Sequence, residues 1–169
     1  CIRQQTTVFL TMAQWFECKI RYDKLQEGGT AVKKVTETFL VDALSFTEAE
    51  SRIIDKRQPY MSGEFSVSAV KRTKISEIFN NESDEADKWY NVKWLITTID
   101  EKPAAVGKPP VEKKVSVLTL VQAIDFEDAL ETFKKNMANT LADFEIAQIN
   151  ETQILDVYPV DQKETNNAD

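Results

Sequence analysis

The stretch Phe39-Leu-Val-Asp-Ala-Leu-Ser-Phe-Thr-Glu-Ala-Glu50 decides the fold, because it predicts a strand that ends in a capped turn and continues as a helix. Ser45 and Glu48 have the spacing of a capping box, in which the serine oxygen accepts a helix N–H and the glutamate reaches back to the cap. Phe46 and Ile53 then fall on one face of the predicted helix.

The same pattern occurs a second time as Thr119-Leu-Val-Gln-Ala-Ile-Asp-Phe-Glu-Asp-Ala-Leu130. A shift of 80 positions gives eight identities between residues 33–53 and residues 113–133. The segments after the helices match at a shift of 79, and the segments before them match at a shift of 74. The recurrence predicts a tandem duplication; the alternative is a likeness that any two segments of this strand and helix order would share.

Each half begins with an alternating segment, which is typical of a strand with one buried face. Residues 15–22 and 89–96 alternate in this way, and a second strand follows in each half. In the third strand the alternation breaks, which predicts a bulge or bend before the strand resumes. The breaks lie between Val67 and Val70 in the first half, and between Ile146 and Ile149 in the second.

We therefore predict an α+β protein, a tandem duplication of a ββαβ unit with pseudo-twofold symmetry, with mainly antiparallel sheet and two helices. The first repeat is expected over residues 15–80 and the second over residues 89–159, joined by an acidic linker at 81–88. One helix covers a three-stranded sheet poorly, so the repeats should share a core. They would form either one continuous sheet with both helices on one side, or two sheets packed face to face.

The two ends of the chain, residues 1–14 and 160–169, are expected to lie outside the fold. Met12 is a natural start position, so residues 1–11 are interpreted as an upstream extension. An arm that packs on a partner is the alternative. The last segment is polar and predicts a disordered tail.

The composition argues against several kinds of site. The 169 residues contain two cysteines and no histidine, so a four-ligand zinc site, a disulfide framework and imidazole catalysis are not expected. The net charge of −7 disfavours general binding to nucleic acid or anionic membranes. No apolar run reaches about 18 residues and no signal peptide is recognisable. We expect a cytoplasmic protein with no membrane contact and no cofactor.

The candidate binding residues are lysines and tryptophans that recur in the two halves. Together they would suit an anion or a single-stranded nucleic acid, since aromatic rings stack on bases and cations contact phosphates. The structural alternative is that the lysines keep exposed strands from pairing with other chains, while the tryptophans pack between the repeats. The set is Trp15, Lys19, Lys33, Lys34, Trp89, Lys93, Lys113 and Lys114.

The carboxylates provide no duplicated site. The acidic linker has no central glycine, so it does not match a calcium loop. Asp42 aligns with Gln122 and Glu37 aligns with Val117, so neither acid has an acidic counterpart in the other half. An enzyme is therefore disfavoured, although an asymmetric carboxylate pair across the halves stays open.

Together with the stretch quoted first, several segments carry a resemblance: Trp15-Phe-Glu-Cys-Lys-Ile-Arg-Tyr22, Lys33-Lys-Val-Thr-Glu37, Ser62-Gly-Glu-Phe65, Leu120-Val-Gln-Ala123, Ala142-Asp-Phe-Glu-Ile-Ala147 and Asp156-Val-Tyr-Pro159. They resemble an uncharacterised family of domains of unknown function, found in gut Bacteroidetes and in their phages and mobile elements. The resemblance covers roughly residues 12–159 and supports Met12 as the natural start. It implies no activity, cofactor or catalytic residue.

We expect a protein of unknown function that acts as a non-enzymatic cytoplasmic binding module of phage or mobile-element type, with another protein as its partner. The alternative is a binder of single-stranded nucleic acid or nucleotides that uses the lysine and tryptophan set. The oligomeric state is left open.

Overall fold

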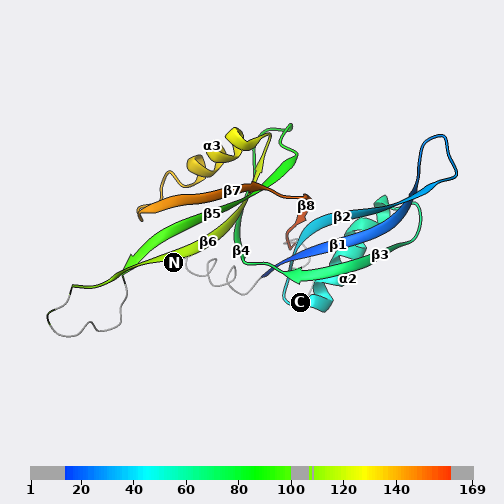
Figure 1. Cartoon of the computed structure of the whole chain (residues 1–169). Coiled ribbons are helices and arrows are strands. Elements are labelled where there is room, and N and C mark those ends of the chain that lie inside the picture. Colours follow the sequence, from blue (N-terminus) through cyan, green and yellow to red (C-terminus); the bar gives the residue numbers. More distant parts are fainter. Residues whose placement is uncertain (1–13, 100–106, 108, 161–169) are drawn as a thin grey trace, which may run out of the picture. The chain divides into compact units, whose positions relative to one another are not determined.

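The computed structural model describes residues 14–99, 107 and 109–160, and it divides into two compact units (Figure 1). The second unit is the continuous segment Ile75–Thr152. The described residues of the first unit come before and after this segment in the sequence. The predicted extension and start at Met12, most of the predicted tail and part of the proline-rich loop lie outside the described residues.

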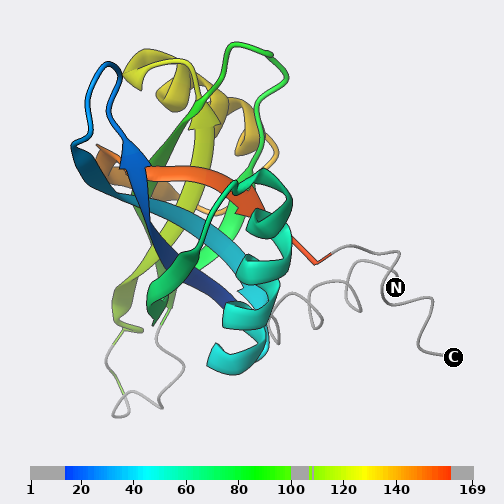
Figure 2. The ribbon, with the colours of Figure 1, turned by 90° about the vertical axis from the view of Figure 1, so that its right-hand side faces the viewer.

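The first unit is a four-stranded sheet in the order β3-β1-β2-β8, with a helix on one face (Figure 2). β1 pairs antiparallel with β2 and β3, whereas β8 pairs in parallel with β2. The helix α2 is followed by the short 3-10 helix η1. The bounds are β1 Gln14–Leu25, β2 Val32–Ala43, α2 Phe46–Arg57, η1 Gln58–Tyr60, β3 Phe65–Arg72 and β8 Ile154–Tyr158.

The second unit repeats this arrangement in the order β4-β6-β5-β7, with α3 packed on one face. β5 pairs antiparallel with β6 and β7, and β4 pairs in parallel with β6. The bounds are β4 Ile75–Phe79, β5 Lys88–Ile99, β6 Glu112–Ala123, α3 Phe126–Asn136 and β7 Phe144–Glu151.

In each sheet the parallel edge strand, β8 or β4, directly follows in the chain an antiparallel edge strand of the other sheet. β4 comes directly after β3 but pairs with β6, and β8 comes directly after β7 but pairs with β2. Thr73 marks the first crossing, where its N–H and Oγ1 both donate to the Trp15 oxygen at 2.9 and 2.7 Å. Thr152 makes the same pair of bonds to the Trp89 oxygen, at 2.9 and 2.8 Å. The repeats in the sequence and the compact units are therefore different divisions of the chain.

The bulges predicted from the broken alternation are confirmed. The register of β1 with β3 shifts so that Ser68 is not paired with a residue of β1. Val67 and Val70 then both pack on the same core. The register of β5 with β7 shifts in the same way at Ala147. The resumed segments are the separate strands β4 and β8, and they pair with β6 and β2 respectively. Alternation shows which side chains share a face, but it does not show which strand pairs with which.

The fold class is confirmed at the level of an α+β protein, which in its described residues has two α-helices and two mainly antiparallel sheets. One continuous sheet, which was one of the two predicted arrangements, is wrong because there are two sheets. The ββαβ duplication and its pseudo-twofold symmetry stay predictions.

The strand–cap–helix joint that opened the sequence analysis forms as predicted. Ser45 caps α2, and its Oγ accepts the N–H of Glu48 at 3.1 Å. The Glu48 carboxylate reaches back one residue further than a capping box requires, to the N–H of Leu44 at 3.2 Å. The fully buried Ala49 and Ile53 then face the sheet, so the joint fixes both the end of the strand and the buried face of the helix.

Candidate binding sites

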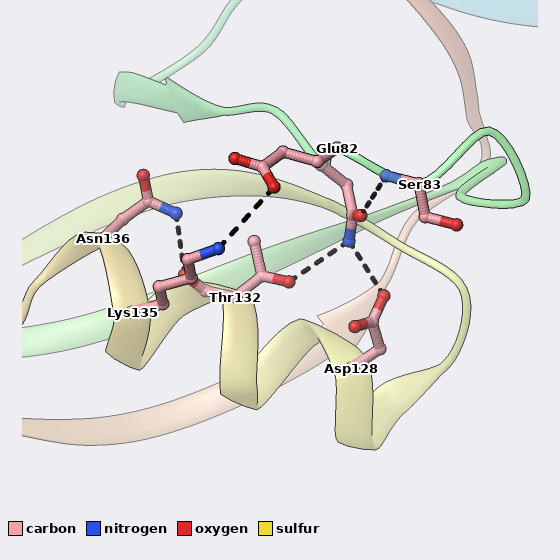
Figure 3. Close-up of polar contacts among 7 residues, drawn as sticks. Glu82, Ser83, Asp128, Thr132, Lys135 and Asn136 are labelled. Carbon is pink, nitrogen blue, oxygen red and sulfur yellow. Dashed lines mark hydrogen bonds and ion pairs between the residues drawn. The ribbon is translucent and has the colours of Figure 1, made fainter.

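A polar junction joins the end of β4 to α3 in the second unit (Figure 3). Asn81, two residues beyond β4, donates through Nδ2 to the Gln122 backbone oxygen at 3.1 Å, to Asp128 Oδ2 at 2.8 Å and to Thr132 Oγ1 at 3.2 Å. Its N–H donates to Gln122 Oε1 at 3.2 Å, and its Oδ1 accepts the N–H of Ser83 at 2.9 Å. The side chain therefore ties the loop after β4 to β6 and to α3.

Asp128 serves the start of the helix as well as this junction. Its N–H donates to Oδ1 of the N-cap residue Asp125 at 2.8 Å, and its Oδ2 accepts the N–H of Ile124 at 2.9 Å. The same oxygen accepts from Asn81. Asp128 therefore connects the first turn of α3 to the residue before the N-cap and to the loop after β4, which suits a structural role.

A cavity of about 480 Å³ lies beside the junction. Lys135 Nζ and Glu82 Oε2 form an ion pair across 3.7 Å, with side chains 76% and 92% exposed, so this pair restrains the cavity only weakly. The lining supplies amides, hydroxyls, three carboxylates and one ammonium group, which can bind a polar ligand by hydrogen bonds and charge. It consists of Asn80, Asn81, Glu82, Ser83, Asp128, Glu131, Thr132, Lys135 and Asn136.

The corresponding junction of the first unit is held by an arginine. Arg52, the seventh residue of α2 as Thr132 is of α3, donates through Nη2 to the Pro159 oxygen at 3.2 Å. Its Nη1 lies 3.9 Å from Glu48 Oε1. Pro159 directly follows β8, as Asn80 directly follows β4. Both junctions thus connect the helix to the end of the parallel strand, with different side chains.

A second polar cluster surrounds Arg57 at the end of α2. Its guanidinium lies 3.6 Å from Glu37 Oε2, donates to the Tyr158 hydroxyl at 3.3 Å and lies over the ring of Phe39, 4.6 Å from the centroid. Tyr22 donates its hydroxyl to Glu37, and this hydrogen bond raises the pKa of Tyr22. These contacts all lie within the unit, so we interpret the cluster as a tie between α2, β1, β2 and β8.

In each unit a hairpin extends beyond the strand that pairs beside it: β1 and β2 extend beyond β3, and β5 and β6 extend beyond β7. We call these the hairpin arms. In the first arm, β1 and β2 continue to the pair Leu25 and Val32, whereas the pairing with β3 stops at Tyr22 (Figure 1). Leu25 and Val32 are 68% and 56% exposed. In the second arm, the exposed Ile99 ends β5 and the exposed Val111 directly precedes β6.

The structure spreads the predicted lysines and tryptophans along the sheets. Trp15, Lys19 and Lys34 share the face of the first sheet opposite α2, but Trp15 and Lys19 are four residues apart and thus roughly 13 Å. Lys33 points to the face of α2 and pairs directly opposite Lys24. The residues therefore form a line rather than a single pocket.

The second set follows the same pattern. Trp89, Lys93 and Lys114 lie on the face opposite α3, and Lys113 lies on the face of α3. Trp89 is only 4% exposed, and Lys114 forms an ion pair with Glu145 at 2.9 Å. Stacking of a base on Trp89 would require the ring to leave its packed position.

Asn81 and the cavity were not predicted from the sequence. Asn81 falls in a polar, acidic segment that has the composition of a solvated linker. One sequence signal bears on Asn81. At the shift of 79 it aligns with Val160, so it lies just past a predicted strand, close to the fold. The lysines of the arms were identified, but their apolar neighbours Leu25 and Val32 were not.

The fold and these surfaces define an α+β protein whose two four-stranded sheets carry a polar cavity and projecting hairpins. The chain belongs to the family described as Domain of unknown function (DUF4494), whose model matches residues 14–160. The resemblance to a family of unknown function is thereby confirmed. A search of the curated proteins found no match.

Two further observations concern membranes and metals. Within the described ranges, neither helix has the length and apolar character needed to cross a membrane. In the same part of the chain, no three Cys, Asp or Glu side chains are grouped so that they could hold a metal ion.

Proposed function

We propose that this protein is a non-enzymatic binding module that contacts another protein through its hairpin arms. The observation that carries the proposal is the exposed pair Leu25 and Val32 at the end of the first arm, directly opposite one another in register. Exposed aliphatic side chains that occur singly need no explanation, but a pair at the end of a projecting ribbon is suited to burial against a partner.

The charges on the first arm indicate the chemistry of the partner. Lys24, Lys33 and Lys34 outnumber Asp23 and Glu27, and within the described residues none of these three lysines forms an ion pair. Lys24 and Lys33 are directly opposite each other, a placement that like charges disfavour unless a partner neutralises them. The arm would therefore suit a protein surface that combines apolar and acidic groups.

The test is affinity capture with the intact protein and with the variant Leu25→Ser/Val32→Ser. We expect the intact protein to retain a protein partner after nuclease treatment and the variant to lose it. Leu141→Ser is the matched control, because Leu141 is fully exposed and lies outside the arms. All three proteins should unfold within about 0.5 kcal/mol of one another, since the changes are at exposed positions. Equal retention by the intact protein and the arm variant would refute the proposal.

The setting follows from the resemblance noted in the sequence. It favours a cytoplasmic protein of phage or mobile-element type in Bacteroidetes, so a lysate of a gut Bacteroidetes host is the first source of partners to use. A lysate that yields an arm-dependent partner would support this setting.

The second candidate is a binder of single-stranded nucleic acid, favoured by the unpaired lysines of the first arm. Fluorescence anisotropy with a labelled oligonucleotide at low salt tests it. Lys33→Glu/Lys34→Glu in the first arm and Lys19→Glu/Lys93→Glu on the sheets should each abolish the binding. If no oligonucleotide binds at low salt, this candidate is excluded. The burial of Trp89 weighs against a stacking role and places this candidate second.

A further inference from the structure

The two helix–strand junctions differ at the seventh residue of the helix, which is a long arginine in α2 and a short threonine in α3. In the first unit Arg52 extends from α2, and its guanidinium lies between the Glu48 carboxylate and the Pro159 oxygen. In the second unit the same helical position is Thr132, whose side chain is too short to reach the end of β4. The cavity of about 480 Å³ lies at this place, lined by Thr132 and Asn80 among others.

The groups that hold the guanidinium in the first unit have counterparts around the cavity. Asp128 occupies the helical position of Glu48, and each carboxylate accepts the N–H of the residue four positions earlier. Asn80 occupies the position of Pro159 after the parallel strand. The amide of Asn81 occupies part of the region that corresponds to the guanidinium and contacts Asp128. The cavity lies beside this amide.

The charge of the lining favours a cation. Glu82, Glu131 and Asp128 outnumber Lys135, the one basic residue of the lining. Glu131 is exposed, lies three residues after Asp128 on α3 and forms part of the lining. A planar guanidinium can donate to a carboxylate and to amide or backbone oxygens together, which an ammonium group does less well.

We propose that the cavity beside α3 binds the guanidinium of an arginine side chain supplied by a ligand, in the place that Arg52 fills in the first unit. The inference does not depend on the hairpin arms, because its residues belong to α3 and the loop after β4. A peptide with an exposed arginine is the chemical class of ligand.

The test uses the full chain and two short peptides that differ in one residue, acetyl-Gly-Arg-Gly-amide and its citrulline counterpart. Citrulline keeps the shape of arginine and removes its charge. Amide chemical shifts of residues 80–83 and 131–136 should move with the arginine peptide, with a Kd in the millimolar range expected for one side chain (about 4 kcal/mol). The citrulline peptide should leave them unchanged. Equal shifts with both peptides, or no shift with either, would overturn the proposal.

Two variants make the test specific to the cavity. Thr132→Arg supplies an internal guanidinium and should abolish the shifts caused by the arginine peptide. Glu131→Gln removes one carboxylate at an exposed position and should weaken binding about threefold without affecting the fold. Glu127→Gln is the matched control, since Glu127 is an exposed carboxylate on α3 outside the lining. Equal weakening by Glu127→Gln and Glu131→Gln would show general charge attraction and refute the site.

Discussion

In the first unit Arg52 reaches from α2 to the end of β8, whereas in the second unit Asn81 reaches from the end of β4 to α3. Both side chains connect the chain just after the parallel edge strand, β8 or β4, to the helix. The strand needs such a connection because it lies at the edge of its sheet, with backbone pairing on one side only. A long side chain on the helix and a short one on the loop serve the same purpose, but only the short one leaves a cavity.

The difference also changes how much each junction depends on one residue. Arg52 donates to the Pro159 oxygen from a partly exposed position, and its ion pair with Glu48 is long, with the Glu48 side chain 39% exposed. Asn81 uses its backbone N–H and both atoms of its amide, in a partly buried position. We therefore expect the second junction to be the more sensitive to substitution.

The largest expected effect comes from removing the anchor of β4. Phe79 is 8% exposed and its ring lies 5.9 Å from that of the fully buried Phe133. Phe79→Ala should lower the free energy of unfolding by about 3 kcal/mol, because it removes apolar contacts and leaves a void. Urea denaturation measures this, with Leu155→Ala on β8 as an exposed control expected to cost under about 0.5 kcal/mol. A cost near that of the control would mean that β4 does not belong to this core.

The next effect separates the two junctions directly. Asn81→Ala should cost about 2 kcal/mol, since it removes the partners of Asp128, the Gln122 oxygen and Ser83 in a partly buried place. Asn136→Ala is a matched amide control, because Asn136 donates to the Thr132 backbone oxygen at an exposed position. It should change the free energy of unfolding by less than about 0.5 kcal/mol. If the two substitutions cost the same, Asn81 is not the tie described above.

Arg52→Ala should cost less than Asn81→Ala, about 1 kcal/mol. The 3.9 Å ion pair with Glu48 is partly exposed and contributes little, whereas the hydrogen bond to Pro159 contributes more. Repeating the urea titration in about 0.5 M salt should leave most of this difference in place, because salt screens the ion pair and not the hydrogen bond. A cost above that of Asn81→Ala would reverse the proposed ranking of the junctions.

The parts of the fold that depend on neighbours in sequence could be predicted. The cap at Ser45, the buried face of α2 and the bulge at Ser68 follow from local spacing, and each is present. The pairing of β4 and β8 could not be predicted, since the few residues between β3 and β4 carry no sign that the chain changes sheets. Thr73 and Thr152 occupy the same position at the shift of 79, but only the structure reveals that they bond to Trp15 near the start of β1 and to Trp89 near the start of β5.

The candidate sites divide in the same way. Lysines at Lys33 and Lys34 could be placed on a hairpin, because charged residues at regular positions in a strand are visible in the sequence. The cavity depends on Asn81 meeting Asp128 and Thr132, which are about 50 positions away in the chain and lie on another element. Composition alone made that segment resemble a solvated linker, and no local pattern distinguishes an amide that folds inward from one that faces water.

The smallest effect tests the position where the junctions differ in charge, Asp42 in the first unit and Gln122 in the second. Burial raises the pKa of the Asp42 carboxyl above its ordinary value, although a hydrogen bond from the Val160 backbone and the charge of Arg52 oppose this. Because the pKa is higher in the folded state, the folded protein keeps the proton over a range of pH in which the unfolded chain has lost it. Stability should therefore fall as the pH rises through that range, and ionised Asp42 should be unfavourable at neutral pH.

Asp42→Asn should consequently raise the free energy of unfolding at about pH 7 and leave it unchanged at about pH 3, where both states are protonated. Gln122→Glu is the reciprocal change in the second unit. Gln122 donates through Nε2 to the Ala86 oxygen at 3.0 Å, a bond that an ionised glutamate cannot make, so this variant should lose stability at neutral pH and regain part of it on acidification. Urea midpoints measured across this pH range provide the comparison. A gain from Asp42→Asn that is the same at both pH values would mean that its cause is packing rather than charge, and would remove the electrostatic distinction between the two junctions.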